Sequence, residues 1–207
     1  MNITVDDIAK VLVPIHMHSD HSIGDGAQSV ESIVKRCKKI GYDSVSLTDH
    51  GTMTGCYPLE RETTKAGIKP IHGCEVYVSE CGDTLDEIRE HHAQVRQTKK
   101  QAAQGDEERV QTRSHLVLLA TNDIGYVNLL NIANDAIVNR TYKKPMATWD
   151  MVEQNNQGLI ATTACLASKL YSLIAHNDVK RLARLLKVYL STDDQKAEYA
   201  GPKEFAP

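Results

Sequence analysis

Short apolar runs alternate with helical patterns along most of this 207-residue chain, and this alternation restricts the folds open to it. Apolar residues at helical spacing follow Ser29, which can cap a helix, and stop before Gly41, which can end one. The same reasoning predicts a helix capped by Thr148, helices at 58–66, 124–140 and 166–190, and strands at 11–15, 44–48, 69–72, 76–79, 115–121 and 158–163. Such alternation predicts an α/β protein with a parallel sheet, open or closed into a barrel.

Two polar stretches interrupt this pattern. Residues 81–113 are rich in Asp, Glu, Gln, Lys and Arg, so they cannot contribute to a core and are predicted to form a solvated loop or an exposed helix between strands. Residues 191–207 are similarly polar. We therefore expect one domain over 1–190, which includes the insertion at 81–113, and a polar tail over 191–207.

Composition excludes several classes of protein. The five cysteines are odd in number and irregularly spaced, which argues against a disulfide framework and for a reducing compartment. No apolar stretch approaches the roughly 18 residues that cross a bilayer, so we expect a cytoplasmic protein without membrane contact. The net charge of −3 is not the global signature of a nucleic-acid-binding protein. Any contact with DNA must therefore be local, or made by another domain.

Two histidines, His16 and His18, follow the first apolar run one residue apart. Side chains alternate along a strand, so both imidazoles point to the same face and can converge on one metal ion. The pair alone is a weak signal, because histidines this close together are more often accidental surface residues. Further metal-binding residue types at the ends of later strands strengthen it.

The further candidates are Asp25 in a Gly-Asp-Gly turn, Asp49-His50 at the end of the strand expected at 44–48, and Cys165 after the strand expected at 158–163. Glu75 lies between the extended runs at 69–72 and 76–79, and His115 lies at the start of its strand. In parallel α/β proteins, functional side chains collect where strands end. Several imidazoles and carboxylates with at most one thiolate suit zinc, manganese or iron and exclude a dedicated calcium site. Their number exceeds the needs of one tetrahedral ion, which predicts a multinuclear centre.

With these residues in place, the chain resembles the polymerase and histidinol phosphatase (PHP) domains. The matching segments are His16-Met17-His18-Ser19, Leu47-Thr48-Asp49-His50-Gly51 and Gly67-Ile68-Lys69-Pro70-Ile71-His72-Gly73-Cys74-Glu75. Within the family it is most similar to the N-terminal domains of bacterial and phage DNA polymerase III alpha subunits, through Asp25-Gly26, His115 to Ala120, Gly125 to Leu129 and Gly158 to Ala161. The resemblance implies a distorted (βα)7-type barrel, here without its last strand–helix units.

The resemblance also implies a ligand set, which matches this chain at His16, His18, Asp25, His50, Glu75, His115 and Cys165. Glu75 takes the position of the carboxylate that bridges two metals. The family closes its site with late Asn-His-Gly and Asp-Gly-His segments that have no match here. We therefore expect two to three divalent transition metals (Zn, Mn or Fe), with two held more firmly than three.

The chemistry is assigned to Glu75, Asp49 and His50, and Asp49 is expected to orient His50 by a hydrogen bond. For Cys165, ligation and a packing role both stay open. His21 lies close enough to the expected site to contact substrate, while a basic run at 35–39 could touch phosphates or simply complement a helix dipole. The remaining histidines and cysteines are expected to be non-ligands: His72, His91, His92, His176, Cys37, Cys56, Cys74 and Cys81.

The function expected from this resemblance is metal-dependent phosphodiester hydrolysis of the 3′–5′ exonuclease type in DNA replication, in the cytoplasm of a bacterial or phage-infected cell. Its partners would be DNA or another phosphorylated substrate, and the remainder of a replicative polymerase or replisome proteins. Two alternatives stay open, namely a catalytically inactive structural module of a replicative polymerase and a small-molecule phosphatase. A polymerase active site is not expected in this chain.

Overall fold

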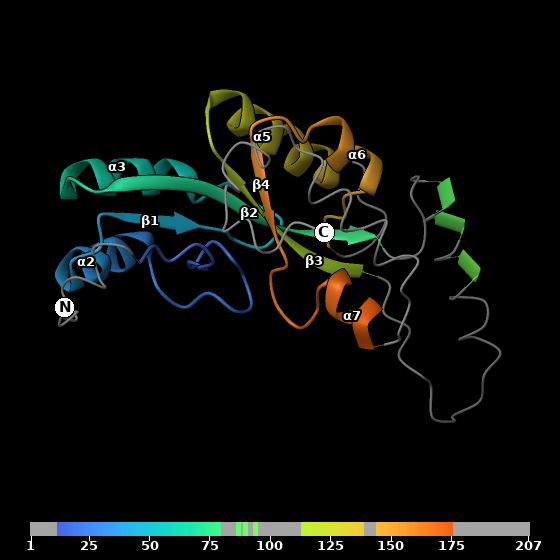
Figure 1. Cartoon of the computed structure of the whole chain (residues 1–207), viewed down its shortest axis with the longest axis horizontal. Helices are drawn as coiled ribbons and strands as arrows, with labels where there is room; N and C mark the ends of the chain where they lie inside the picture. The colour runs from blue at the N-terminus through green and yellow to red at the C-terminus, as the bar shows by residue number, and fades with distance from the viewer. Residues whose placement is uncertain are drawn as a thin grey trace, which may run out of the picture.

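The computed structural model describes residues 12–79, 86–87, 89–90, 93–94, 113–138 and 144–175. Helices and strands alternate over most of these residues, as Figure 1 shows. The elements are α2 (Val30–Ile40), β1 (Ser44–Leu47), α3 (Cys56–Ala66), β2 (Lys69–Ser79), β3 (Arg113–Ala120), α5 (Asp123–Val138), α6 (Trp149–Gln154), β4 (Leu159–Thr162) and α7 (Lys169–Ala175). The expected α/β class is confirmed.

The strands form a four-stranded sheet in the order β1-β2-β3-β4. Strands β1 and β2 are parallel, but β3 is antiparallel to both β2 and β4. The prediction of a parallel sheet is therefore wrong for β3. Strand–helix alternation does not fix strand direction here, because the connection from β2 to β3 is the polar insertion, whose described residues are exposed and do not pack on the sheet as a crossover helix does. The (βα)7-type barrel stays a prediction.

Strand β2 is one strand of 11 residues, although the sequence predicted two separate runs. Its first part, residues 69–72, pairs with β1, and its second part, residues 73–79, pairs with β3. The change of partner occurs at Gly73, where a Cβ atom would lie 2.7 Å from a Leu119 methyl carbon and 2.8 Å from a Thr48 methyl carbon. A residue without a side chain therefore allows the two halves of the sheet to meet.

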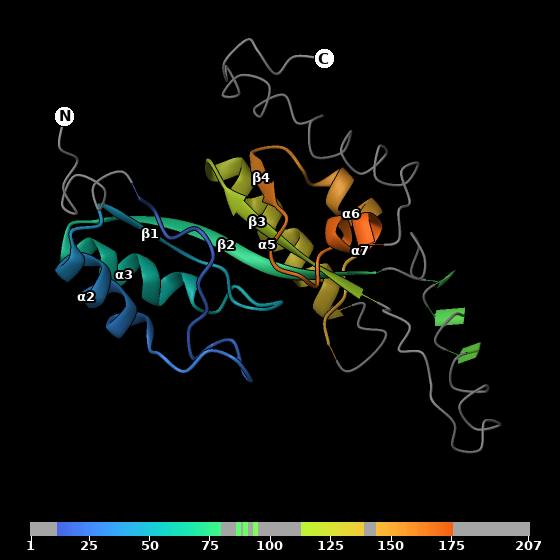
Figure 2. The ribbon, with the colours of Figure 1, turned by 60° about the horizontal axis from the view of Figure 1, so that its bottom comes forward.

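Each half of the sheet has its own hydrophobic core. At the β1 end, α2 and α3 pack around buried Ile33, Val45 and Leu59. At the other end, α5 and α6 cover β2, β3 and β4 around buried Leu118, Leu129 and other apolar side chains. Figures 1 and 2 show the two groups of helices at opposite ends of β2. Strand β2 therefore connects the two cores.

The helix ends follow the expected local chemistry. Ser29 caps α2 by accepting a hydrogen bond from the Ser32 N–H, and Gly41 ends it with φ of 90°. Thr148 caps α6 in the same way, through the Met151 N–H. In the segment expected at 166–190, α7 covers Lys169–Ala175, and the remainder after 175 lies outside the described residues. The caps confirm the local predictions, and the helix expected at 166–190 is confirmed over Lys169–Ala175, three residues later than its expected start.

The first expected strand, at 11–15, is not a strand in its described residues 12–15. This segment still lies beside β1, because Ser46 N–H donates to the Pro14 carbonyl at 3.1 Å and Thr48 N–H to the Met17 carbonyl at 2.8 Å. Pro14 has no N–H to donate, which weakens a regular ladder. The prediction placed the segment correctly but assigned it the wrong regular structure.

The described residues of the polar insertion, 86–87, 89–90 and 93–94, are helical and exposed, which agrees with the second of the two predicted forms, a solvated loop or an exposed helix. The tail at 191–207 lies outside the described residues. Across the part of the chain that the structure describes, no helix combines the length and the apolar character needed to span a bilayer.

Candidate metal centre

The carboxylate of Glu75 is the centre of a cluster of imidazoles. Glu75 lies in the second part of β2, and its side chain is only 1% exposed. Its Oε2 atom lies 2.5 Å from His16 Nε2 and 3.0 Å from His18 Nε2. Its Oε1 atom lies 2.6 Å from His115 Nδ1. Both oxygens of a buried carboxylate therefore face ring nitrogens from other segments of the chain.

The direction of β3 explains how His115 reaches this cluster from the start of its strand. In an all-parallel sheet, a strand's first residues lie at the edge opposite to the other strands' last residues. Because β3 runs antiparallel to β2, its beginning lies beside the end of β2, and His115 pairs with Tyr77. His115 lies at the start of its strand, unlike the candidates that follow strands, and the antiparallel direction of β3 explains this difference.

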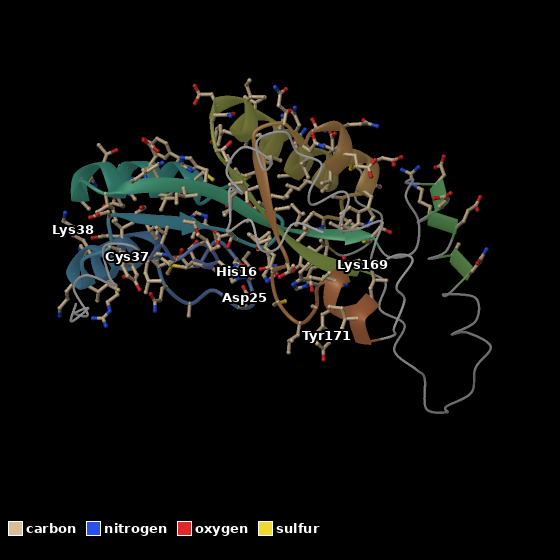
Figure 3. The ribbon with its side chains drawn as sticks, in the orientation of Figure 1. His16, Asp25, Cys37, Lys38, Lys169 and Tyr171 are labelled. Atoms are coloured by element: carbon tan, nitrogen blue, oxygen red, sulfur yellow. The ribbon has the colours of Figure 1, made fainter. Side chains whose placement is uncertain are left out.

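A second group of side chains continues the cluster towards solvent. His50 Nε2 lies 2.8 Å from Asp25 Oδ2 and 3.8 Å from Glu75 Oε2. The rings of His18 and His50 are stacked with centroids 4.5 Å apart. Ser22 holds this part together, since its hydroxyl donates to Asp25 Oδ1 at 2.6 Å and accepts from the His50 backbone N–H at 3.2 Å. Figure 3 shows that His16 and Asp25 lie near each other at this site.

The charge state of the cluster follows from burial and these contacts. Burial alone would raise the pKa of Glu75, but hydrogen bonds from His115, His16 and His18 together hold the pKa of this carboxyl well below its ordinary value. Burial lowers the pKa of His50. The hydrogen bond to Glu75 raises the pKa of His18, against the effect of burial. Glu75 is therefore anionic at neutral pH, while His50 favours its neutral, lone-pair form.

Asp49 has a different role from the one expected. Its buried carboxylate accepts hydrogen bonds from the Ser19 N–H at 2.6 Å and from the Ser19 hydroxyl at 2.9 Å. The prediction that Asp49 orients His50 by a hydrogen bond is wrong, because the buried His50 Nδ1 has no hydrogen-bond partner in the described part of the chain. Asp49 instead anchors the residue that follows His18.

Cys165 lies at the rim of the cluster. Its Sγ atom is 3.6 Å from His115 Nδ1 and 4.0 Å from Glu75 Oε1. The residue is exposed, so it is not the small buried hydrophobe of the packing alternative. Its neighbour Ala164 has a positive φ of 52°, a conformation that costs energy for a residue with a side chain. A strained loop thus holds this thiol beside His115.

The arrangement fits transition-metal ions. Three sets of side chains each present ligand atoms within 4.8 Å of one another: His16, His18 and Glu75; His18, Asp25 and His50; and His50, Glu75 and His115. Nitrogen and carboxylate oxygen donors in this mixture suit zinc, manganese and iron. Two ring nitrogens of the cluster, His18 Nδ1 and His50 Nδ1, are also buried without a hydrogen-bond partner among the described residues. Buried polar atoms without partners indicate a site that a further group would complete.

The structure thus brings together all seven residues expected as ligands. Of the residues expected not to be ligands, His72 faces away and contacts Glu60 of α3 at 3.2 Å. Burial raises the pKa of both Cys56 and Cys74 to about 12, which keeps these thiols un-ionised. His21 contacts Thr54 at 3.0 Å. The other expected non-ligands, His91, His92, His176 and Cys81, lie outside the described residues.

Sequence reasoning missed Tyr77, which forms one wall of the cluster. Its ring is stacked on His50 with centroids 5.2 Å apart and meets His115 edge-on at 5.0 Å. The signal was present, because Tyr77 follows Glu75 by two positions in a strand and must share its face. Ser19 and Ser22 were also missed. Nothing in their spacing marks them, since their contacts depend on how the loop folds.

Comparison with known proteins identifies a family and related sequences. Residues 14–198 match the PHP domain family. The DNA polymerase III subunit alpha of Borreliella burgdorferi is 34% identical over 165 residues, which are 80% of this chain and 13% of that protein. The DNA polymerase III subunit alpha of Aquifex aeolicus is 32% identical over 182 residues, 88% of this chain and 15% of that protein. This chain therefore corresponds to a small part of the length of these relatives.

Among solved structures, an amidohydrolase from Chromobacterium violaceum aligns with 86% of this chain and 55% of its own, at 16% identity and a TM-score of 0.34. A TM-score this low supports no argument about the fold. The family match, in contrast, covers most of the chain, and the two polymerase subunits align with 80% and 88% of it. The family match and the similarity to DNA polymerase III alpha subunits together show that the chain belongs to the PHP domain family.

Proposed function

We propose that this domain is a metal-dependent phosphoesterase that hydrolyses phosphodiester bonds of DNA, as a 3′–5′ exonuclease in replication. The observation that carries the proposal is the Glu75 carboxylate, which is buried and has ring nitrogens beside both of its oxygens. A carboxylate in this position can bridge two cations, as the two-metal phosphoesterases require. DNA is proposed as the substrate because the curated relatives are replicative polymerase subunits.

The proposed ligands hold two or three divalent ions, Zn, Mn or Fe, and are His16, His18, Asp25, His50, Glu75, His115 and Cys165. Bound there, the ions would supply a water of low pKa as the nucleophile and offset the charge that develops on the phosphoryl oxygens. The protein prepares this site without large rearrangement, because the ligand atoms of each set already lie within 4.8 Å of one another.

The side chains of the protein have distinct tasks in this proposal. Glu75 supplies a permanent negative charge, since its lowered pKa keeps it ionised. His50 presents a lone pair, since burial keeps it neutral. Asp49 positions the His16–Ser19 segment through Ser19, and the buried ring of Tyr77 covers His50 on one face and excludes water from it. The chemistry is therefore assigned to Glu75 and His50, with Asp49 in a positioning role.

The test is Glu75→Gln, compared with Glu153→Gln on the exposed surface of α6 as a matched control. We expect Glu75→Gln to abolish hydrolysis of bis(p-nitrophenyl) phosphate and of single-stranded DNA and to lower the metal content, because a neutral amide bridges two cations poorly. The control should keep both properties. Wild-type hydrolysis rates in Glu75→Gln would refute the assignment.

The direction of degradation is tested separately, with oligonucleotides blocked at one end. A block at the 3′ end should prevent digestion, while a block at the 5′ end should not. A protein that binds metal but hydrolyses none of these substrates would be a structural module instead. Rapid hydrolysis restricted to small phosphomonoesters would identify a small-molecule phosphatase.

A further inference from the structure

We propose that Arg113 and Lys144 form a subsite, next to the metal centre, for a second phosphate of the substrate. The subsite would make the domain specific for a nucleic-acid strand over a small ester with a single phosphate. This inference rests on the proposed phosphoesterase function and adds a specificity determinant to it. It goes beyond the ligand set, because neither residue belongs to the cluster around Glu75.

The two cations reach Tyr77 from opposite sides of β2. Arg113 begins β3 and pairs with Ser79 on one edge of β2. Lys144 precedes a segment that runs along the other edge, where the Ala147 N–H donates to the Tyr77 carbonyl at 2.8 Å. The Lys144 ammonium group donates to the Tyr77 hydroxyl at 2.8 Å, and the Arg113 guanidinium carbon lies 5.4 Å from the centre of the ring. Both positive charges therefore gather at one buried aromatic ring.

The same ring touches the metal centre, which sets the position of the subsite. Tyr77 is stacked on His50 and meets His115 edge-on. The Tyr77 ring thus separates the charges of Lys144 and Arg113 from the proposed ligands His50 and His115. The two cations lie beside the proposed metal site and do not occupy it. If one phosphoryl group of a nucleic-acid strand were bound at the metal ions, Arg113 and Lys144 would be free to bind the neighbouring phosphate of that nucleic-acid strand.

The charges are available to an anion. Among the ion pairs formed by the described residues, none joins Arg113 or Lys144 to a carboxylate. Lys144 uses one of its three N–H donors on Tyr77 and is exposed, so the others can reach a phosphate oxygen. Arg113 offers a planar fork that suits phosphate. A chain with a net charge of −3 needs such a local cationic patch to hold a polyanion.

The experiment compares Arg113→Gln, Lys144→Met and the double variant with Lys38→Ala as a control. Lys38 is an exposed lysine in the last turn of α2, and Figure 3 shows it at the end of the molecule remote from His16. Of the two roles considered for the basic run at 35–39, this position fits the complement to the helix dipole and not a phosphate contact at the metal centre. Two substrates are used with the metal-loaded protein, bis(p-nitrophenyl) phosphate with one phosphate and a single-stranded oligodeoxynucleotide with many. Metal content and melting temperature confirm that each variant is folded and loaded.

Each single variant should lower kcat/KM for the oligonucleotide about tenfold more than for the small ester, through KM, since a charged hydrogen bond is lost. The slope of log(kcat/KM) against log[salt] should become shallower by about 0.7 per lost phosphate contact. Lys38→Ala should behave like the wild type. An equal loss on both substrates, or an unchanged oligonucleotide value and salt slope, would overturn the proposal.

Binding separates this inference from the proposed hydrolysis. Fluorescence anisotropy of a labelled oligonucleotide measures the subsite even if the wild-type protein hydrolyses neither substrate. In that case the phosphoesterase proposal fails, yet a weaker oligonucleotide affinity in the double variant, with a reduced salt dependence, supports the subsite. Wild-type affinity in the double variant overturns it.

Discussion

The Nδ1 atom of His115 lies 2.6 Å from Oε1 of Glu75, although the two residues are 40 positions apart and are not direct partners in the sheet. The register pairs His115 with Tyr77 and Glu75 with Val117, so the contact is a diagonal one across β2 and β3. Diagonal neighbours share one face of the sheet. The antiparallel strand β3 thereby supplies an imidazole to the site from its beginning, which lies beside the end of β2.

The first prediction concerns metal content. We expect the purified protein, never exposed to chelator, to carry at least two transition-metal ions, because three overlapping sets of ligands share Glu75, His18 and His50. Elemental analysis of the purified chain measures this. Substitution His18→Ala should lower the content, while His72→Ala should not, because His72 contacts Glu60 instead. Less than about one ion per chain in the wild type would contradict the prediction.

The second prediction concerns Asp49→Asn. The amide cannot accept both hydrogen bonds from Ser19 as the carboxylate does, so the segment that carries His16 and His18 loses its anchor. We expect metal affinity to fall by roughly 10–100-fold, measured by competition with a chromogenic chelator. The neighbouring exposed residue supplies a control, since Asp20→Asn should retain wild-type affinity. Equal affinities for the two variants would exclude this role of Asp49.

The third prediction concerns Gly26→Ala. A Cβ atom at this position would lie 1.6 Å from the Ser19 carbonyl oxygen, and a backbone atom cannot move aside as a flexible side chain can. The loop that carries Asp25 must therefore shift. We expect a loss of about 1–3 kcal/mol in the free energy of unfolding together with weaker metal binding. Urea denaturation measures the first quantity, and Ala27→Ser at the exposed neighbour should leave it unchanged.

The fourth prediction concerns pH. Protons and metal ions compete for the imidazoles, and the hydrogen bond to Glu75 raises the pKa of His18 above its ordinary 6.5. Protonation of His18 therefore begins to oppose metal binding above that pH, whereas His50, with a lowered pKa, stays neutral to more acidic conditions. Metal affinity should fall as the pH is lowered from about 8 to about 6, at least tenfold by chelator competition. A flat profile over this range would show that His18 is not a ligand.

Some features of the molecule could be predicted from single segments of sequence. The cap at Ser29, the stop at Gly41 and the cap at Thr148 depend on groups a few residues apart, and each was predicted correctly. The candidate ligands could also be named from the sequence, because metal-binding residue types after apolar runs are visible there and match a known family. Their role as ligands stays a prediction. The assignment of Asp49 failed because its partner Ser19 lies 30 positions away.

The sequence by itself determined the α/β class, most element positions and the set of residues able to hold metal, since hydrophobic periodicity, caps and residue chemistry are local properties. Only the tertiary structure decided the direction of β3, the continuity of β2 and the gathering of Arg113 and Lys144 at Tyr77. An apolar strand has the same pattern whether its neighbour is parallel or antiparallel. Contacts across 40 or 59 positions depend on sheet register and loop closure, which no short segment encodes.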